Sequence, residues 1–237
     1  MLKIVLSSYR TGSSAFTNML LSPGGTNHGE LFPVEHNPTM EERINYTKGW
    51  PDDVFDIIKD DDIIKIQADT IQKYPEVLDQ LESRFDCEYH LLYRKDVFAQ
   101  AFSWTKSILA QEQFKDIKRK ILRPGDEPNG MWFHTDYHRK LIFDWNDENA
   151  VKIFDSKLET AMEHIGVLSR YNGKGRLNTY EALFPDEGRL KQPYIMKGRM
   201  PAGSYLFARW VTSKKKYARF PVELNVPAEC IPLEFVK

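Results

Sequence analysis

The stretch MLKIVLSSYRTGSSAFTNMLL (residues 1–21) decides the fold class of this 237-residue chain. Residues 2–6 form a short, mostly apolar and β-branched run, which is typical of a buried strand. Apolar residues return at helical spacing over 15–20. Between them lies SSYRTGSS (7–14), with four serines, a threonine, a glycine and an arginine. The pattern predicts a strand, a polar turn and a helix.

The same alternation continues along the chain and predicts an α/β protein. Runs at 63–67 and 87–93 have the length of buried strands, and Leu78, Leu81 and Phe85 between them mark one face of a helix. Strands that alternate with helices are typical of a parallel sheet covered on both faces. We therefore expect a three-layer α/β/α fold with a central parallel sheet.

Two later helices and one late strand follow from the same reasoning. A helix is expected after Asp96, which is a suitable N-cap, and another over 151–168. RLNTY (176–180) has the pattern of a short strand. Because no repeat, low-complexity tract or clear linker divides the chain, residues 1–237 are expected to form a single domain.

The composition argues against several classes of function. The formal net charge of -1 gives the whole chain no electrostatic attraction for nucleic acid or for an anionic membrane. No apolar run approaches the roughly 20 residues that a membrane helix needs, and the N-terminus lacks the layout of a signal peptide. Cys87 and Cys230 are expected to be free thiols in the cytoplasm. We expect no nucleic-acid or membrane partner, and the oligomeric state stays open between monomer and homodimer.

The polar turn after the first strand has the composition of an anion site. Ligands of an open parallel sheet bind beyond the carboxyl ends of its strands, where this turn lies. The helix that follows presents unpaired N–H groups and a partial positive charge. Arg10 adds a full charge with a planar set of donors, and Ser13 and Ser14 add hydroxyl groups. The structural alternative is a serine-capped helix beside a surface arginine.

The turn differs from the nucleotide-binding P-loop in its basic residue. When Gly12 is aligned with the last glycine of G-x-x-x-x-G-K-[ST], Ser13 occupies the lysine position and Ser14 the hydroxyl position. The basic residue is instead Arg10. This departure weakens the prediction of a P-loop kinase or NTPase, which stays as an alternative with Asp69 as its candidate acidic metal ligand.

Three motifs resemble those of sulfotransferases that use PAPS (3′-phosphoadenosine 5′-phosphosulfate). RTGSS (10–14) is similar to the family's 5′-phosphosulfate-binding loop, YRKDVFAQAFS (93–103) to its 3′-phosphate-binding segment, and TYEALF (179–184) to its Tyr-Glu-x-Leu stretch. They occur in the family's order, and the KDVFAQAFS portion most resembles bacterial sulfotransferases that act on trehalose. The resemblance implies the P-loop NTPase-like sulfotransferase fold, with PAPS as cofactor and no metal.

The resemblance also implies a set of cofactor-binding residues. Many family members place an arginine eight positions before the serine that binds the 3′-phosphate, a position held here by Lys95, with Arg94 one residue earlier. Either basic residue fits that role. The family's late glycine-rich loop is matched best by MKGRMPAG (196–203). In chain order, the implied residues are Arg10, Thr11, Gly12, Ser13, Ser14, Arg94, Lys95, Ser103, Lys197 and Arg199.

The implied reaction moves a sulfuryl group in line from PAPS to a hydroxyl of a small-molecule acceptor, with a carbohydrate as one candidate. The product nucleotide is 3′,5′-adenosine bisphosphate, and Arg10 would face the charge that develops on the leaving phosphate. The catalytic base is open between Glu30, which matches a glutamate of the trehalose-type enzymes, and His28, the usual type of base elsewhere in the family. Lys65, among apolar strand residues, either lines the acceptor pocket or reaches solvent. A non-catalytic nucleotide-binding homologue is a further alternative.

Overall fold

The computed structural model describes residues 1–32, 52–121, 141–185, 194–201, 222–223 and 226–235. The chain divides into two compact units, each built from two segments. Unit 1 comprises Met1–Lys95 and Met162–Pro185, and unit 2 comprises Asp96–Ala161 and Asp186–Lys237. The expectation of a single domain over 1–237 stays a prediction, and the two units are described separately.

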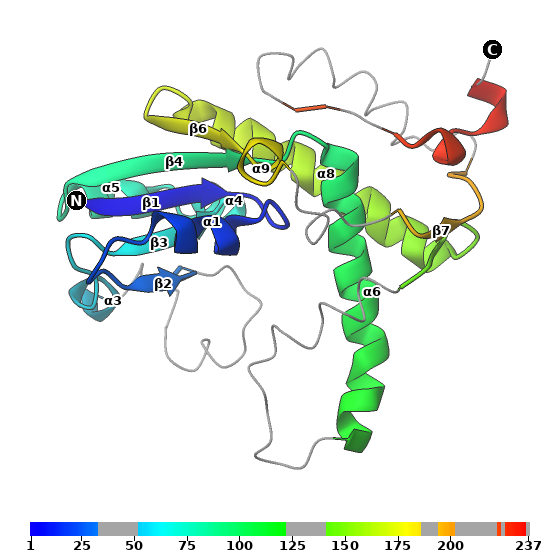
Figure 1. Cartoon of the computed structure of the whole chain (residues 1–237), viewed down its shortest axis with the longest axis horizontal. Helices are drawn as coiled ribbons and strands as arrows, with labels where there is room; N and C mark the ends of the chain where they lie inside the picture. The colour runs from blue at the N-terminus through cyan, green and yellow to red at the C-terminus, as the bar shows by residue number, and fades with distance from the viewer. Residues whose placement is uncertain (33–51, 122–140, 186–193, 202–221, 224–225, 236–237) are drawn as a thin grey trace. The chain divides into compact units, whose positions relative to one another are not determined.

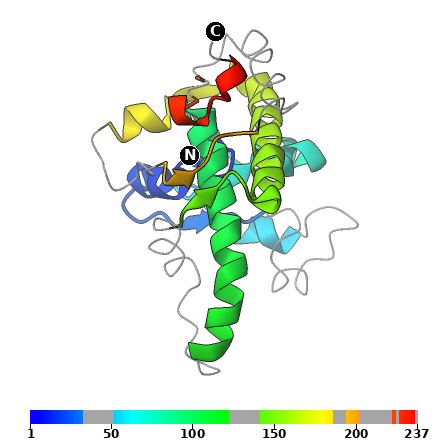
Figure 2. The same cartoon turned by 90° about the vertical axis from the view of Figure 1, so that its right-hand side faces the viewer.

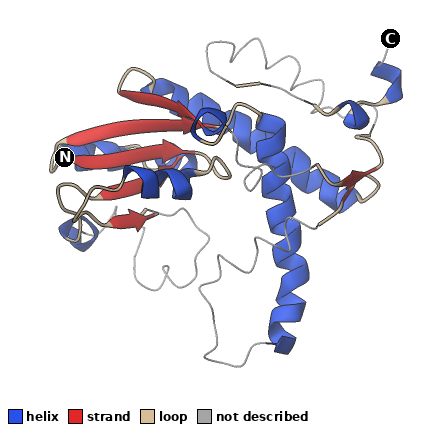
Figure 3. Ribbon diagram, in the orientation of Figure 1, coloured by secondary structure: helices blue, strands red, loops and turns tan. Residues whose placement is uncertain are grey.

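Unit 1 is built on a five-stranded parallel sheet with the strand order β2-β3-β1-β4-β6. The strands are β1 (Leu2–Ser7), β2 (Asn27–Gly29), β3 (Ile63–Gln67), β4 (Cys87–Tyr93) and β6 (Gly175–Thr179). All neighbouring strands pair in parallel, so their arrows point the same way in Figure 3. The predicted α/β class with a central parallel sheet is confirmed, and β3 and β4 have the bounds that their apolar runs indicated.

Helices flank the sheet of unit 1. α1 (Ser13–Leu20) follows β1 on the way to β2 and β3, whereas α4 (Ala68–Lys73) and α5 (Glu76–Glu82) lead from β3 back across β1 to β4. Right-handed crossovers that run in opposite directions lie on opposite faces of a sheet. Figure 1 accordingly shows α1 in front of the sheet and α4 and α5 behind it. The winding reverses at β1, so a ligand crevice is expected at the carboxyl ends of β1 and its neighbours.

The core between α1 and the sheet explains why the first 21 residues fold as they do. Val5, Ile63 and Leu92, one from each central strand, are buried against Phe16 of α1, and Leu183 packs at the edge of this cluster. α9 (Tyr180–Leu183), which supplies Leu183, directly follows β6, and unit 1 also contains α3 (Asp52–Asp56) and η1 (Ser169–Tyr171). The packing holds the amino end of α1 at the carboxyl edge of the sheet.

Unit 2 contains the long helix α6 (Val97–Ile121) and most of α8 (Glu148–Leu168), which Figure 2 shows beside one another. Asp96 caps α6 as predicted, because its Oδ1 accepts the N–H of Ala99 at 2.8 Å. Two short strands, β5 (Phe143–Asp144) and β7 (Met196–Lys197), pair in parallel. η2 (Ala228–Cys230) and η3 (Leu233–Phe235) follow near the end of the chain.

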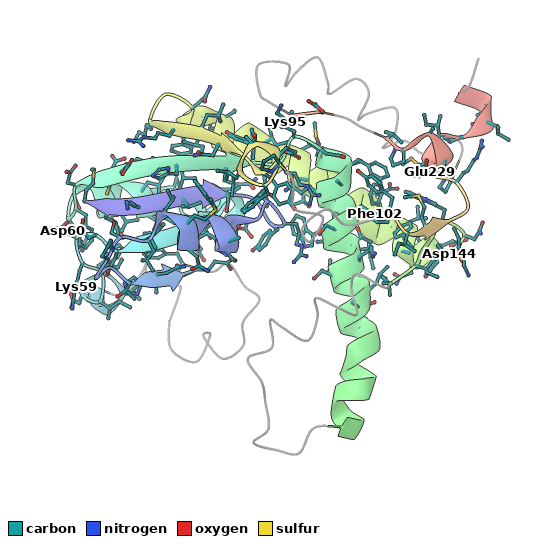
Figure 4. All side chains as sticks on the ribbon, viewed as in Figure 1. Lys59, Asp60, Lys95, Phe102, Asp144 and Glu229 are labelled. Atoms are coloured by element: carbon teal, nitrogen blue, oxygen red, sulfur yellow. The ribbon has the colours of Figure 1, made fainter. Side chains whose placement is uncertain are left out.

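Aromatic side chains form the core of unit 2. The rings of Phe98 and Phe154 lie 5.0 Å apart and those of Phe143 and Trp145 lie 4.7 Å apart, and Phe102, labelled in Figure 4, packs against Phe143. Within the described ranges, no helix is both long enough and apolar enough to span a bilayer.

Candidate anion-binding site

The loop between β1 and α1 (residues 8–12) lies at the carboxyl end of the sheet in unit 1. Lys95, just beyond β4, marks this end in Figure 4, and Lys59 and Asp60 mark the opposite end. The buried hydroxyl of Thr11 donates to the carbonyl of Ser8 at 2.8 Å. Because this bond is internal to the loop, Thr11 fixes the loop's shape.

Position 12 needs a glycine because of both its backbone conformation and the side chains around it. Its φ of 78° is a conformation that residues with a Cβ atom disfavour. A Cβ atom at this position would lie 2.8 Å from the ring of Tyr180 and 3.2 Å from that of Phe184. Two of the three sequence motifs, RTGSS and TYEALF, therefore pack directly against each other.

The first turn of α1 offers backbone donors beside the loop. The carbonyl of Gly12 accepts the N–H groups of Ala15 and Phe16 at 3.1 Å and 3.0 Å. The N–H groups of Gly12, Ser13 and Ser14 have no acceptor among the residues that the structure describes. Such donors at a helix N-terminus favour an anion.

Arg94 reaches this loop from the end of β4. Its side chain is 7% exposed and its guanidinium carbon lies 4.7 Å from the centre of the Tyr180 ring. Nη1 donates to the carbonyl of Arg10 at 3.4 Å, and in the described part of the chain Nε has no partner and no carboxylate pairs with the group. Because a buried charge without a counter-ion is costly, Arg94 indicates a site for an anion that the described residues do not supply.

Arg10 adds a second positive charge at the same edge. Its φ of 62° is unusual for a residue other than glycine, and such strain is concentrated at functional sites. Although its side chain is exposed, desolvation by the surrounding protein and then the positive charge of Arg94 lower the pKa of Arg10 to about 10. The group therefore stays protonated at neutral pH, and an anion between the two arginines would relieve their repulsion.

Lys65 and Glu30 form a polar network next to the loop. Lys65 Nζ lies 3.1 Å from Ser14 Oγ and 2.8 Å from Glu30 Oε1. Gln67 Nε2 donates to the same Glu30 oxygen at 2.8 Å. Glu30 Oε2 has no partner in the described residues, and the side chain is 34% exposed. The network thus leaves one carboxylate oxygen accessible to a substrate.

His28 lies at the other end of β3 from this network. Its Nε2 is 2.7 Å from Oδ2 of Asp62, which directly precedes β3, whereas Glu30 is bonded to residues in the second half of that strand. The Asp62 carboxylate also accepts the backbone N–H groups of Thr26 and Lys59. The structure therefore places Glu30, but not His28, with the β1–α1 loop.

The remaining residues implied by the resemblance are distributed over both units. Lys95 follows Arg94, and its N–H donates to Glu181 Oε2 at 2.8 Å. Ser103 is buried in α6, and Lys197 and Arg199 are exposed on and beyond β7. These last three belong to unit 2, so the candidate site consists of unit 1 residues.

Several contacts of the site have no assigned role in the sequence analysis. Tyr180 contacts both Gly12 and Arg94, and its place directly after a strand in TYEALF was the available signal. Ser8 Oγ lies 2.9 Å from Nδ1 of the buried His164, a pair 156 residues apart that no local pattern reveals. Tyr9 donates to Asp69 Oδ2 at 2.8 Å, which engages the carboxylate named above as a candidate metal ligand.

Comparisons with known proteins give no relative: no family model, curated protein or solved structure matches this chain. The function must therefore be argued from the residues and from the geometry of the site.

Proposed function

We propose that this chain is a PAPS-dependent sulfotransferase of the trehalose-like type, with a P-loop NTPase-like sulfotransferase fold. It would sulfate a hydroxyl of a small-molecule acceptor, with a carbohydrate as the first candidate, in the cytoplasm. The observation that carries the proposal is Arg94, a buried guanidinium beside a helix N-terminus whose Nε has no partner among the described residues. That combination fits an anionic ligand, and the resemblance of the flanking motifs favours one with two separated phosphates.

The residues of unit 1 provide groups for both ends of such a nucleotide. The backbone N–H groups of Gly12, Ser13 and Ser14, together with Arg10, would hold the 5′-phosphosulfate. Arg94, with Lys95 as the other basic residue, would hold the 3′-phosphate. The bond from Arg94 to the Arg10 carbonyl keeps these two sets of donors adjacent.

The chemistry assigns one role to each remaining group. When bound, PAPS supplies the sulfuryl group: its bond to the 5′-phosphate oxygen breaks as the bond to the acceptor oxygen forms, and 3′,5′-adenosine bisphosphate leaves. Arg10 stabilises negative charge at the loop. Glu30 Oε2, the oxygen that no described residue engages, takes the proton from the acceptor hydroxyl.

A binding measurement tests the proposal directly. We expect 3′,5′-adenosine bisphosphate to stabilise the protein by about 2.7 kcal/mol at 100 times its dissociation constant. Arg94→Met should weaken that binding by about 100-fold, because losing one partner of a buried charged contact costs about 2–5 kcal/mol. The free variant should unfold no more easily than the wild type, since it loses an uncompensated buried charge. Calorimetric titration and thermal unfolding measure the two quantities.

Arg84→Met is the matched control. Arg84 also lies over an aromatic ring of unit 1, that of Phe55 at 4.5 Å, but it is exposed and at the end of α5. Its removal should leave bisphosphate binding unchanged. Stabilisation by ATP with Mg²⁺ but not by the bisphosphate would favour the kinase or NTPase alternative. Tight bisphosphate binding with no transfer from labelled PAPS to any acceptor in a metabolite extract would favour a non-catalytic homologue.

A further inference from the structure

Lys65 is unusual because a charged side chain occupies the middle of a central strand. It is 7% exposed and stands between Ile64 and Ile66, which are fully buried in β3. An apolar residue would suit this position in the sheet, since burial of an ammonium group is costly unless it is well compensated. Lys65 therefore has a function that an apolar residue would not provide.

The contacts of the ammonium group indicate what that function is. Among the described residues, Nζ has two oxygen partners, Ser14 Oγ at 3.1 Å and Glu30 Oε1 at 2.8 Å. Ser14 belongs to the first turn of α1, where the proposed anion binds. An ammonium group has three donors, so one donor remains for a ligand oxygen beside Ser14.

Only one of the two carboxylate oxygens of Glu30 is bonded by the described residues. Lys65 and Gln67 both donate to Oε1, which leaves Oε2 for another partner. Tyr9, whose hydroxyl donates to Asp69, is a further titratable group that interacts electrostatically with Glu30. The described contacts thus make Lys65 the direct link between the anion site and the carboxylate.

We propose that Lys65 is a catalytic residue that couples the two halves of the site. It contacts the transferring sulfuryl group with its remaining donor and orients Glu30 so that Oε2 faces the acceptor. This inference rests on the proposed function. In a P-loop, a lysine of the loop itself supplies the positive charge, but Ser13 occupies that position here. In this proposal Lys65 of β3 supplies that charge instead.

The test compares Lys65→Met with Lys3→Met. Lys3 is a partly buried lysine of the same sheet, whose Nζ donates to the Leu20 carbonyl and to Ser22 Oγ, both at 2.7 Å. We expect Lys65→Met to lower kcat for transfer from PAPS by about 100-fold or more, the effect of losing one donor to a transition state. The KM for PAPS and the affinity for 3′,5′-adenosine bisphosphate should change by no more than about threefold. Lys3→Met should keep wild-type kinetics.

A second readout does not depend on turnover. Inorganic sulfate added to protein saturated with 3′,5′-adenosine bisphosphate would occupy the place of the transferring group. It should raise the Tm of the wild type and of Lys3→Met but not that of Lys65→Met. Lys65→Arg, which keeps the charge, should retain part of this increase, and Lys65→Gln supplies the neutral comparison if the methionine variant does not fold.

The outcomes separate this inference from the function on which it rests. If the wild type does not bind the bisphosphate, the proposed function itself is wrong. If the wild type binds it and a folded neutral variant keeps kcat within about threefold, or keeps the full sulfate-induced increase in Tm, Lys65 has no catalytic role. A variant that loses bisphosphate affinity as much as kcat would place Lys65 in nucleotide binding and would also overturn the inference.

Discussion

The two ends of the parallel sheet in unit 1 use charged residues differently. At the amino end, His28 lies 2.7 Å from Asp62, and Lys174 lies 2.8 Å from Glu82. At the carboxyl end, Arg94 is buried and has no carboxylate partner in the described residues. A buried charge without a counter-ion lowers stability, so the contrast supports the proposal that the carboxyl end binds an anionic ligand, whereas the paired charges at the amino end stabilise the fold.

The same contrast separates the two candidate bases. His28 and Glu30 are two residues apart, but one is paired with Asp62 before β3 and the other with Lys65 and Gln67 within the strand. An extended chain advances about 3.3 Å per residue, which carries the segment from the amino end towards the loop. Proximity in sequence therefore does not give the two residues equivalent positions.

The largest expected effect is the difference between Glu30→Gln and His28→Gln in turnover. Glu30→Gln keeps the side-chain shape but removes the proton acceptor, which lowers kcat by about 100- to 10,000-fold. Bisphosphate affinity should be nearly unchanged. His28→Gln should keep kcat close to that of the wild type. Steady-state kinetics with PAPS and a responsive acceptor measure both variants, and the opposite ranking would identify His28 as the base.

The second comparison concerns two glycines with positive φ in unit 1. Gly12→Ala places a Cβ atom 2.8 Å from the Tyr180 ring at a φ of 78°, whereas the Cβ atom of Gly24→Ala, at a φ of 87°, meets no described residue within 4 Å apart from its chain neighbours. Backbone strain costs about 1–2 kcal/mol in each. Overpacking adds about 1–3 kcal/mol in Gly12→Ala alone. Urea unfolding measures the difference, and equal losses would mean that the Tyr180 ring does not limit this position.

Much of unit 1 was predictable because its signals are local. A strand is defined by a short apolar run and a helix by apolar spacing, so β3 and β4 were located from neighbouring residues alone, as was the start of α6 in unit 2. The hypothesis that the β1–α1 loop binds an anion also came from local signals, since its glycine, hydroxyl groups and arginine lie within five residues. What local patterns did not reveal is that the chain forms two units whose segments alternate in sequence.

The rest of the site depends on contacts between distant residues. Arg94 donates to the carbonyl of a residue 84 positions earlier, and Glu30 accepts from Gln67, 37 positions later. Such contacts follow from strand order and register, which the apolar pattern does not specify. The sequence left Lys65 open between the acceptor pocket and solvent, and the structure pairs it with the exposed Ser14 hydroxyl and with Glu30, which is 34% exposed.

The smallest expected effects concern the two charged pairs at the amino end of the sheet, and the test is whether the buried pair contributes more to stability than the exposed pair. Burial raises the pKa of Asp62, but hydrogen bonds from His28 and from backbone N–H groups outweigh it, so the pKa lies below its ordinary value. When folding lowers the pKa of a carboxyl group, the ionised group stabilises the protein at pH values above its pKa in the unfolded state. This stabilisation is lost as the pH falls through the pKa of the group in the folded state. Asp62→Asn should therefore cost about 1–3 kcal/mol at pH 7.

Glu82→Gln is the matched control for Asp62→Asn. The Asp62 side chain is 3% exposed, whereas Glu82 is 37% exposed and its partner Lys174 is 46% exposed. An exposed pair contributes less than about 1 kcal/mol and is screened by salt. Urea unfolding should show the Asp62→Asn loss shrinking below about pH 4 and resisting added salt, whereas the Glu82→Gln loss should vanish in high salt. Equal, salt-sensitive losses would mean that Asp62 is no better shielded from solvent than Glu82. The hydrogen bonds that join Asp62 to His28 and to the Thr26 backbone would then contribute no more than a surface ion pair.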